Sequence, residues 1–166
     1  MKNKILTGLQ ETTQELLDTI SKFSQEEFNR VPFEGSWTPG QVADHIAKAE
    51  AGMPAVWRGR THPTERAVDA NVPFIEKIFL DFSTKLKSPD FILPSNEPLD
   101  KQTLYNSIKN TRASIEELAA TIDLSLTYMD FSFPSIGELT GIEGAVFIIS
   151  HSKRHIHQLQ KMLGKQ

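Results

Sequence analysis

Apolar residues recur every three or four positions along most of the chain, which is the spacing of amphipathic helices. The pattern predicts helices over residues 2–22, 38–54, 72–86, 101–123 and 141–163. Pro54 is expected to kink or end the second of these helices, because proline has no backbone N–H to donate. No segment shows the period-two alternation of a half-buried strand over more than a few residues. The fold class is therefore predicted to be all-α.

The predicted helix ends carry capping signals. Three helix starts combine an N-cap Ser or Thr with Glu or Gln three residues later: Ser24 with Glu27, Thr38 with Gln41, and Thr140 with Glu143. The first of them predicts a short helical turn after the first long helix. Asp100 is expected to cap the fourth helix, and Gly164 to close the last one.

Two long segments lack helical periodicity. Residues 58–70 are polar and are predicted to be a connector, and residues 88–98 contain three prolines, which predicts an extended loop that crosses the body of the molecule. We expect residues 1–166 to form one domain, since a chain of this length can bury a single core. Four long helices with loops of mixed length most simply pack as a four-helix bundle, in which facing helices build ligand sites from inward-pointing side chains.

Composition narrows the classes of function. The 18 Lys and Arg residues against 21 Asp and Glu give a formal charge of −3, so nucleic-acid binding is not expected. No apolar run approaches the ~20 residues of a membrane-spanning helix, and the N-terminal segment lacks the unbroken apolar stretch of a secretory signal. A cytoplasmic protein without membrane contact is therefore expected. The chain has no cysteine, which excludes thiolate metal ligands and catalysis by a thiol of the protein itself.

The chain contains five histidines, and two of them share one side of the last predicted helix. On a helical wheel of about 100° per residue, His151 and His155 lie one turn apart beside the apolar face, whereas His157 points well over a third of a turn away. Two imidazoles one turn apart, with Cβ atoms about 5–6 Å apart, suit the coordination of one divalent ion such as zinc. Taken alone, the pair is more often a half-exposed surface feature.

His45 shifts this balance towards a metal site, because it lies beside the apolar positions of the second helix. Three histidine ligands with an open fourth position are typical of a catalytic metal site rather than a closed structural one. Asp44, Glu50 and Gln158 are candidates to orient an imidazole, although each is also an ordinary solvated helix residue. His62, in the polar connector, is predicted to lie at the surface.

Three motifs support the same three histidines. Residues 36–46, SWTPGQVADHI, are similar to a Trp-Ser/Thr-x-x-x-x-x-x-His-Leu signature at the start of a second helix. Residues 134–140, PSIGELT, are similar to Pro-x-x-Gly-x-Leu-Thr, and residues 151–158, HSKRHIHQ, to His-x-x-x-His-x-x-Gln. In this order the motifs resemble those of the DinB-like (damage-inducible) superfamily, and the resemblance covers essentially the whole chain.

The resemblance implies a four-helix bundle, commonly a homodimer, that holds nickel, zinc or a related divalent ion on three histidines. In this chain the matching positions are His45, His151 and His155. Characterised relatives include S-transferases that act with the low-molecular-weight thiols bacillithiol or mycothiol, and other relatives have been proposed to be metal-dependent hydrolases. Because the chain keeps all three positions, the resemblance supports metal binding more strongly than any one reaction, and fold analogy does not choose the substrate.

Three interpretations of the function stay open. In the first, the metal is a Lewis acid that activates a small-molecule thiol or water, and the thiol must come from solution because the chain has no cysteine. Trp37, Trp57 and the segment 131–133 would then line a pocket for a small-molecule substrate, although core filling is the simpler role for most of these aromatics. In the second, the bundle is a non-catalytic module that dimerises or binds a metal or ligand. In the third, the protein holds no metal.

Overall fold

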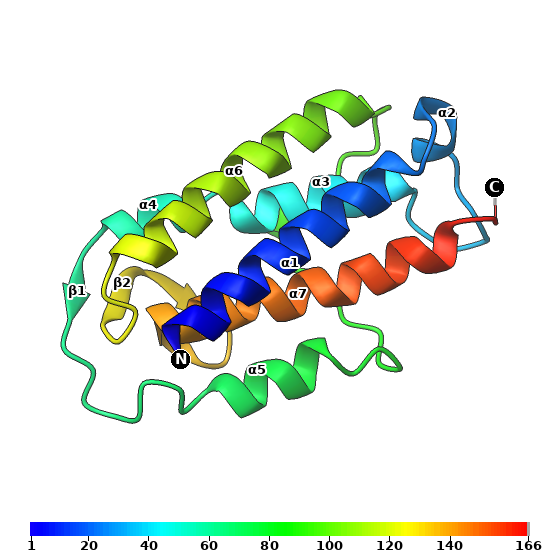
Figure 1. Cartoon of the computed structure of the whole chain (residues 1–166). Coiled ribbons are helices and arrows are strands. Elements are labelled where there is room, and N and C mark those ends of the chain that lie inside the picture. Colours follow the sequence, from blue (N-terminus) through cyan, green and yellow to red (C-terminus); the bar gives the residue numbers. More distant parts are fainter. Residues whose placement is uncertain (166) are drawn as a thin grey trace.

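The computed structural model describes residues 1–165, and its main body is a bundle of four helices (Figure 1). The bundle helices are α1 (Lys2–Ser21), α3 (Pro39–Glu50), α6 (Lys101–Thr121) and α7 (Gly141–Met162). Helices α1 and α3 each pack against both α6 and α7. The predicted four-helix bundle is confirmed.

Shorter elements surround the bundle. They are α2 (Gln25–Phe28), α4 (Met53–Arg58), β1 (Thr61–His62), α5 (Val72–Phe79), the 3₁₀ helix η1 (Asp90–Ile92), β2 (Thr127–Phe133) and β3 (Gly137–Thr140). Helix α5 packs along the outer side of α7, and η1, from the predicted proline-rich loop, packs against α3. Among the described residues, no helix combines the length and the apolar character that crossing a membrane requires.

The helix ends largely follow the capping signals. At all three predicted starts, the N-cap side chain accepts from the backbone N–H three residues on, and the Glu or Gln at that position accepts from the N-cap N–H. Asp100 caps α6 by accepting from the N–H of Thr103. Helix α3 ends at Glu50 and α4 begins at Met53, because Pro54 has no N–H to donate to the carbonyl of Glu50.

The third predicted helix is shorter than the periodicity indicates, since α5 ends at Phe79 rather than near residue 86. The carboxylate of Asp81 accepts hydrogen bonds from Ser83 and Thr84, which hold a turn in place of a further helical turn. The guanidinium of Arg154 on α7 donates to the carbonyl oxygens of Asp81 and Thr84. A contact between distant parts of the chain therefore fixes the end of this helix.

The structure also contains a small antiparallel sheet of three strands, in the order β1-β2-β3, where the sequence predicted no strand. Apolar and polar positions alternate along β2 only from Met129 to Phe133, because Thr127 and Tyr128 are both buried and interrupt the pattern. In addition, the register between β2 and β3 shifts between Tyr128 and Ser132. The alternating stretch of β2 is short, and β1 and β3 have only two and four residues, so the sequence pattern alone did not predict the sheet. The tertiary fold supplies the pairing partners of these strands.

A buried carboxylate ties the connector before α5 to the start of α7. Glu143 accepts from both Nη atoms of Arg66, at 2.6 and 2.7 Å, and from the backbone N–H of Asn71 at 2.9 Å. Since Asn71 directly precedes α5, these hydrogen bonds position α5 beside α7. That placement brings the ring of Phe79 towards the middle of α7, where it packs against His151.

A polar layer divides the hydrophobic core into two clusters. The cluster nearer the sheet includes Leu9, Ile115 and Ile148, together with Tyr128 of β2. The cluster towards the other end of the bundle includes side chains from all four bundle helices: Leu16, Ile46, Ile108 and Leu159. Each bundle helix places a buried polar residue at the boundary between the two clusters.

The polar layer consists of Thr12, Glu50, Arg112 and Ser152, one from each bundle helix, and all four are buried. Arg112 donates from Nε to Oε2 of Glu50 at 2.6 Å and from Nη2 to Oε1 at 2.7 Å. It also donates to the hydroxyl oxygens of Ser152 and Thr12. A buried charge is strongly destabilising without its partner, so the pair holds the bundle helices at one relative height.

We expect the single variants Arg112→Met and Glu50→Leu each to lower the free energy of unfolding by about 3–5 kcal/mol, because each leaves an unpaired buried charge. The double variant Arg112→Met/Glu50→Leu should recover most of this loss, since it removes both charges. Urea denaturation of the four proteins measures the coupling. Losses that simply add in the double variant would contradict the assignment of this layer as a mutually dependent ion pair.

Candidate metal centre

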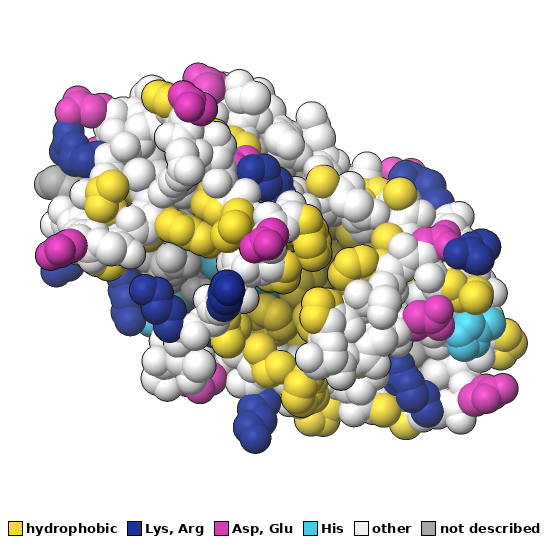
Figure 2. All heavy atoms as spheres, turned by 180° about the vertical axis from the view of Figure 1, so that it is seen from behind, with side chains coloured by type: hydrophobic (Ala, Val, Ile, Leu, Met, Phe, Trp, Pro, Cys, Tyr) yellow, Lys and Arg dark blue, Asp and Glu magenta, His cyan; other side chains and the backbone are white. Residues whose placement is uncertain are grey.

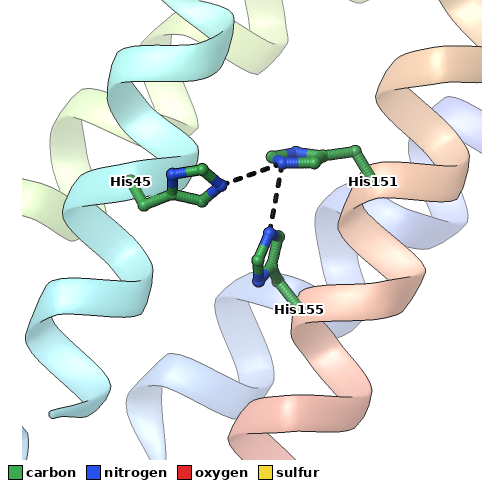
Figure 3. A group of neighbouring side chains, drawn as sticks. All are labelled: His45, His151 and His155. Atoms are coloured by element: carbon green, nitrogen blue, oxygen red, sulfur yellow. Dashed lines mark hydrogen bonds between the residues drawn. The ribbon is translucent and has the colours of Figure 1, made fainter. Parts of the chain in front are cut away.

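His45 of α3 meets His151 and His155 of α7 inside the bundle (Figure 3). The Nε2 atom of His151 lies 3.1 Å from Nε2 of His45 and 3.1 Å from Nε2 of His155. One ring nitrogen of each histidine lies within 4.8 Å of those of the other two. The residues are 2%, 3% and 7% exposed. The three histidines that the sequence singled out therefore converge, and the interpretation of His151 and His155 as a surface pair is wrong.

The other two histidines lie outside the cluster, as predicted. The ring of His157 stacks on Phe82, with ring centroids 4.4 Å apart. His62 lies on β1, where its partly exposed ring is 3.2 Å from a carboxylate oxygen of Glu138. The helical-wheel argument thus separated His157 correctly from its neighbours on α7.

Two hydrogen bonds determine which ring nitrogen of His45 and of His155 carries the proton. Nδ1–H of His45 donates to the carbonyl oxygen of Ile92 at 2.9 Å, and Nδ1–H of His155 donates to Oε1 of Gln158 at 2.8 Å. Since both partners only accept, Nε2 of each neutral ring carries a lone pair directed at His151. This is the tautomer that a metal ligand needs.

His151 cannot satisfy this arrangement with a proton of its own. Its Nε2 faces two lone pairs and can donate to only one of them, and its buried Nδ1 has no hydrogen-bond partner among residues 1–165. A cation at the point of convergence could be bound by the Nε2 lone pairs of all three histidines at once. Two nitrogens on a tetrahedral zinc, with Zn–N of about 2.0–2.1 Å, lie about 3.3 Å apart, close to the separations observed. The residues present therefore fit a divalent ion.

Burial keeps the three imidazoles in the neutral form that ligates metals. Burial lowers the pKa of His45, and the hydrogen bond to Ile92 only partly opposes it. Burial, followed by the positive charges that His155 and His45 would carry, holds the pKa of His151 well below its usual value. Burial also lowers the pKa of His155 to about 3. All three lone pairs are therefore available at neutral pH.

Of the three residues proposed to orient an imidazole, only Gln158 does so. Asp44 instead accepts from Nζ of Lys48 at 2.8 Å and from the backbone N–H of Ser95 at 2.8 Å. Glu50 pairs with Arg112 in the polar layer. The alternative that these residues are solvated is also wrong, because both acidic side chains are buried.

The sequence did not reveal the residue that orients His45, because it acts through its backbone. The carbonyl of Ile92 is held over α3 by the neighbouring loop, where Lys48 donates to the carbonyl of Leu93 at 2.9 Å and Gln41 to that of Ser95 at 3.1 Å. A backbone carbonyl leaves no signature in a side-chain pattern. The sequence analysis also missed Arg112. Its burial could have been predicted, because it is a charged residue at a helical interval from Ile108 and Ile115.

The cluster borders a cavity of about 1000 Å³, and aromatic rings surround the histidines within it. The ring of Trp37 packs against His45 with centroids 5.3 Å apart. Phe79 and Phe147 pack against His151 with centroids 5.6 and 5.3 Å apart. These rings cover part of the imidazoles of His45 and His151 and so limit their contact with water.

The aromatics proposed from the sequence as pocket or core residues divide between the two roles. Trp57 belongs to the core cluster nearer the sheet. Trp37, Phe131 and Phe133 line the cavity. Core filling is therefore confirmed for Trp57, whereas the other three contribute to the walls beside the histidines.

Comparisons with known proteins agree with this fold. The model of the DinB superfamily matches residues 8–159. An uncharacterized protein of Bacillus subtilis (strain 168), YuaE, is 26% identical over 159 residues, which cover 91% of this chain and 92% of that protein.

Two solved structures share the fold. One is TT2238, described as a four-helix bundle protein, with 21% identity and a TM-score of 0.61 over 97% of this chain and 99% of that chain. The other is YfiT from Bacillus subtilis, described as a probable metal-dependent hydrolase with an unusual four-helix bundle topology. It has 18% identity and a TM-score of 0.63 over 97% of this chain and 85% of that chain.

The free energy of unfolding of the metal-free protein is expected to fall as the pH falls below about 6.5, where unfolded histidines take up protons. Because burial lowers the pKa of His155 to about 3, the unfolded state binds more protons between these two values, and acid favours it. The slope is about 1.4 kcal/mol per pH unit for each such histidine. Urea unfolding of chelator-treated protein measures it, with His155→Gln as the comparison. An equal slope in the variant would contradict this cause.

Proposed function

The chain belongs to the DinB superfamily, and from its buried cluster of three histidines we propose that it is a divalent-metal-dependent enzyme. We propose that the three histidines would hold an ion able to activate a small nucleophile, either a low-molecular-weight thiol or water, against a substrate held in the cavity. The observation that carries this proposal is the convergence of three neutral imidazoles beside a cavity of about 1000 Å³. The description of YfiT as a probable metal-dependent hydrolase supports it.

Each residue of the cluster has a role in this proposal. His45, His151 and His155 would hold the ion, and three histidine ligands leave coordination positions open to solvent or substrate. The carbonyl of Ile92 and the side chain of Gln158 fix the ring orientations. When bound, the ion would supply Lewis acidity, which lowers the pKa of a thiol or of water.

The described part of the chain offers no carboxylate base at the cluster. The acidic side chains that line the cavity are Glu34 and Asp90, and both are exposed. Asp44 and Glu50 are engaged by Lys48 and Arg112. With no carboxylate base at the cluster among residues 1–165, lowering the pKa of a thiol or of water would fall to the ion.

The size of the cavity favours a reaction with a sizeable substrate. Pockets of ~300–1000 Å³ typically enclose a drug-sized ligand, and this one lies at the upper end of that range. Since the chain has no cysteine, a thiol transferase of this type needs a thiol from solution in addition to its electrophile. A cavity of this volume accommodates two small reactants next to the histidines.

The alternative is a non-catalytic module that binds a metal or ligand, or dimerises, without turnover. The same cluster would then stabilise the bundle, because an ion bound only to the folded state raises its stability. A homodimer and a cytoplasmic location stay predictions for either function. Light scattering of the untagged protein measures the oligomeric state.

Protein purified without a histidine tag is expected to contain about one divalent ion per chain. His45→Ala and His151→Ala should lose it, because two remaining imidazoles bind much more weakly than three. His62→Ala and His157→Ala are matched controls that should retain it, since both residues lie outside the cluster. Elemental analysis measures the ion in each protein. Full occupancy in His45→Ala would exclude a shared site.

The metal-loaded protein is expected to turn over a chlorinated aromatic electrophile with one member of a panel of low-molecular-weight thiols, or to hydrolyse one member of an ester panel. The Gln158→Ala variant should weaken metal binding about 10–100-fold, because the tautomer of His155 is no longer fixed. Product formation and metal titration measure the two effects. Complete metal occupancy without any turnover would favour the non-catalytic module.

A further inference from the structure

The outer part of the cavity is unusually apolar for an exposed surface. Most of the ten phenylalanines of the chain line the cavity. Large apolar side chains at its mouth also face solvent: Phe33, Phe82, Leu86, Phe91 and Leu93 are 38–68% exposed. Figure 2 shows this face, where apolar side chains gather in a hollow. Exposed apolar surface concentrated in one hollow marks a site for an apolar ligand.

The same cavity is rich in positive charge, although the chain as a whole carries −3. The basic residues that line it are Lys48, Lys85, Lys87, Arg154 and Lys161. The acidic residues that line it are Glu34 and Asp90. Lys and Arg side chains stand beside the hollow in Figure 2. A cavity with an excess of one charge attracts ligands of the opposite charge.

Not all of these cations are available to a ligand. Lys48 pairs with Asp44 at 2.8 Å, and Arg154 donates to backbone carbonyls of the turn after α5. Lys85, Lys87 and Lys161 are exposed and form no ion pair with any carboxylate among residues 1–165. They come from two separate segments, the loop after α5 and the last turn of α7, which both border the cavity.

We propose that the cavity accepts a small molecule with an apolar body and an anionic group, and that Lys85, Lys87 and Lys161 bind the anionic group at the mouth. The aromatic walls would enclose the apolar body next to the histidines. This proposal rests on the proposed function, because the ligand that it describes would be the substrate of the same site. The binding itself depends on residues outside the histidine cluster, so metal-free protein can test it.

The probes are anilinonaphthalene sulfonate and phenylnaphthylamine, which share their aromatic rings and differ by the sulfonate. The double variant Lys85→Glu/Lys87→Glu should weaken binding of the sulfonate about tenfold and change binding of the neutral compound less than twofold. The control Lys4→Glu/Lys109→Glu changes the net charge equally at exposed helix positions outside the cavity and should leave both affinities within twofold. Fluorescence titration of chelator-treated protein measures all affinities.

Several outcomes would overturn this assignment. Equal losses for both compounds would show that the variant altered the cavity rather than an anion contact. An unchanged affinity for the sulfonate, or an equal loss in the control, would show that these lysines do not bind the anion. Sulfonate binding that requires a metal would show that the sulfonate binds the metal ion rather than the lysines. None of these results affects the elemental analysis of the histidine variants, so failure of the two proposals can be told apart.

Competition extends the test to smaller ligands. Octanoate is expected to displace the sulfonate at lower concentration than octanol or octylamine, because only octanoate combines the alkyl chain with a negative charge. Its advantage over octanol should shrink as salt is added, since salt screens exposed charges. It should also shrink in Lys85→Glu/Lys87→Glu. An equal displacement by octanoate and octylamine would contradict the preference for anions.

Discussion

The buried ion pair between Arg112 and Glu50 is the constraint on which the arrangement of the bundle depends. It lies between two apolar clusters, each of which tolerates some sliding of one helix along another, because apolar contacts have no fixed direction. The ion pair and its hydrogen bonds to Ser152 and Thr12 do have direction. Displacing α3 or α6 along its axis would leave a charge unpaired in the core, and displacing α1 or α7 would remove a hydroxyl that accepts from Arg112. These contacts therefore favour a single relative height for all four helices.

The ion pair also affects the positions of the histidines, because it sets the relative height of the helices that carry them. Glu50 follows His45 on α3 by five residues, about 7.5 Å along the helix axis. Ser152 directly follows His151 on α7. Because Arg112 contacts both Glu50 and Ser152, it sets the height of α3 relative to α7 at the level where the imidazoles meet. The geometry of the cluster is thus supported by a layer of side chains that takes no direct part in it.

The cavity has buried polar groups at its floor and exposed charged groups at its mouth. The floor is a set of three neutral imidazoles, and a carbonyl oxygen and an amide oxygen fix the lone pairs of two of them, His45 and His155. The walls are aromatic, and the mouth carries lysines that lack acidic partners among the described residues. In the proposed function, such an arrangement would separate recognition of a ligand at the mouth from activation of a nucleophile at the floor. In this respect the cavity provides more information about substrate than the fold, which the chain shares with TT2238 and YfiT at 21% and 18% identity.

The sequence by itself determined the elements whose causes are local. Capping residues are adjacent to the helices they start, so Thr38 and Thr140 predicted the starts of α3 and α7 correctly. Helical spacing likewise placed His151 and His155 on one side of α7. Only the tertiary structure decided what depends on distant partners: the three strands, the end of α5 at Phe79, the carbonyl of Ile92 that orients His45, and the cavity. The physical reason is that capping and periodicity act within a few residues, whereas strand pairing, backbone hydrogen bonds between segments and enclosed volume arise only once the helices have packed.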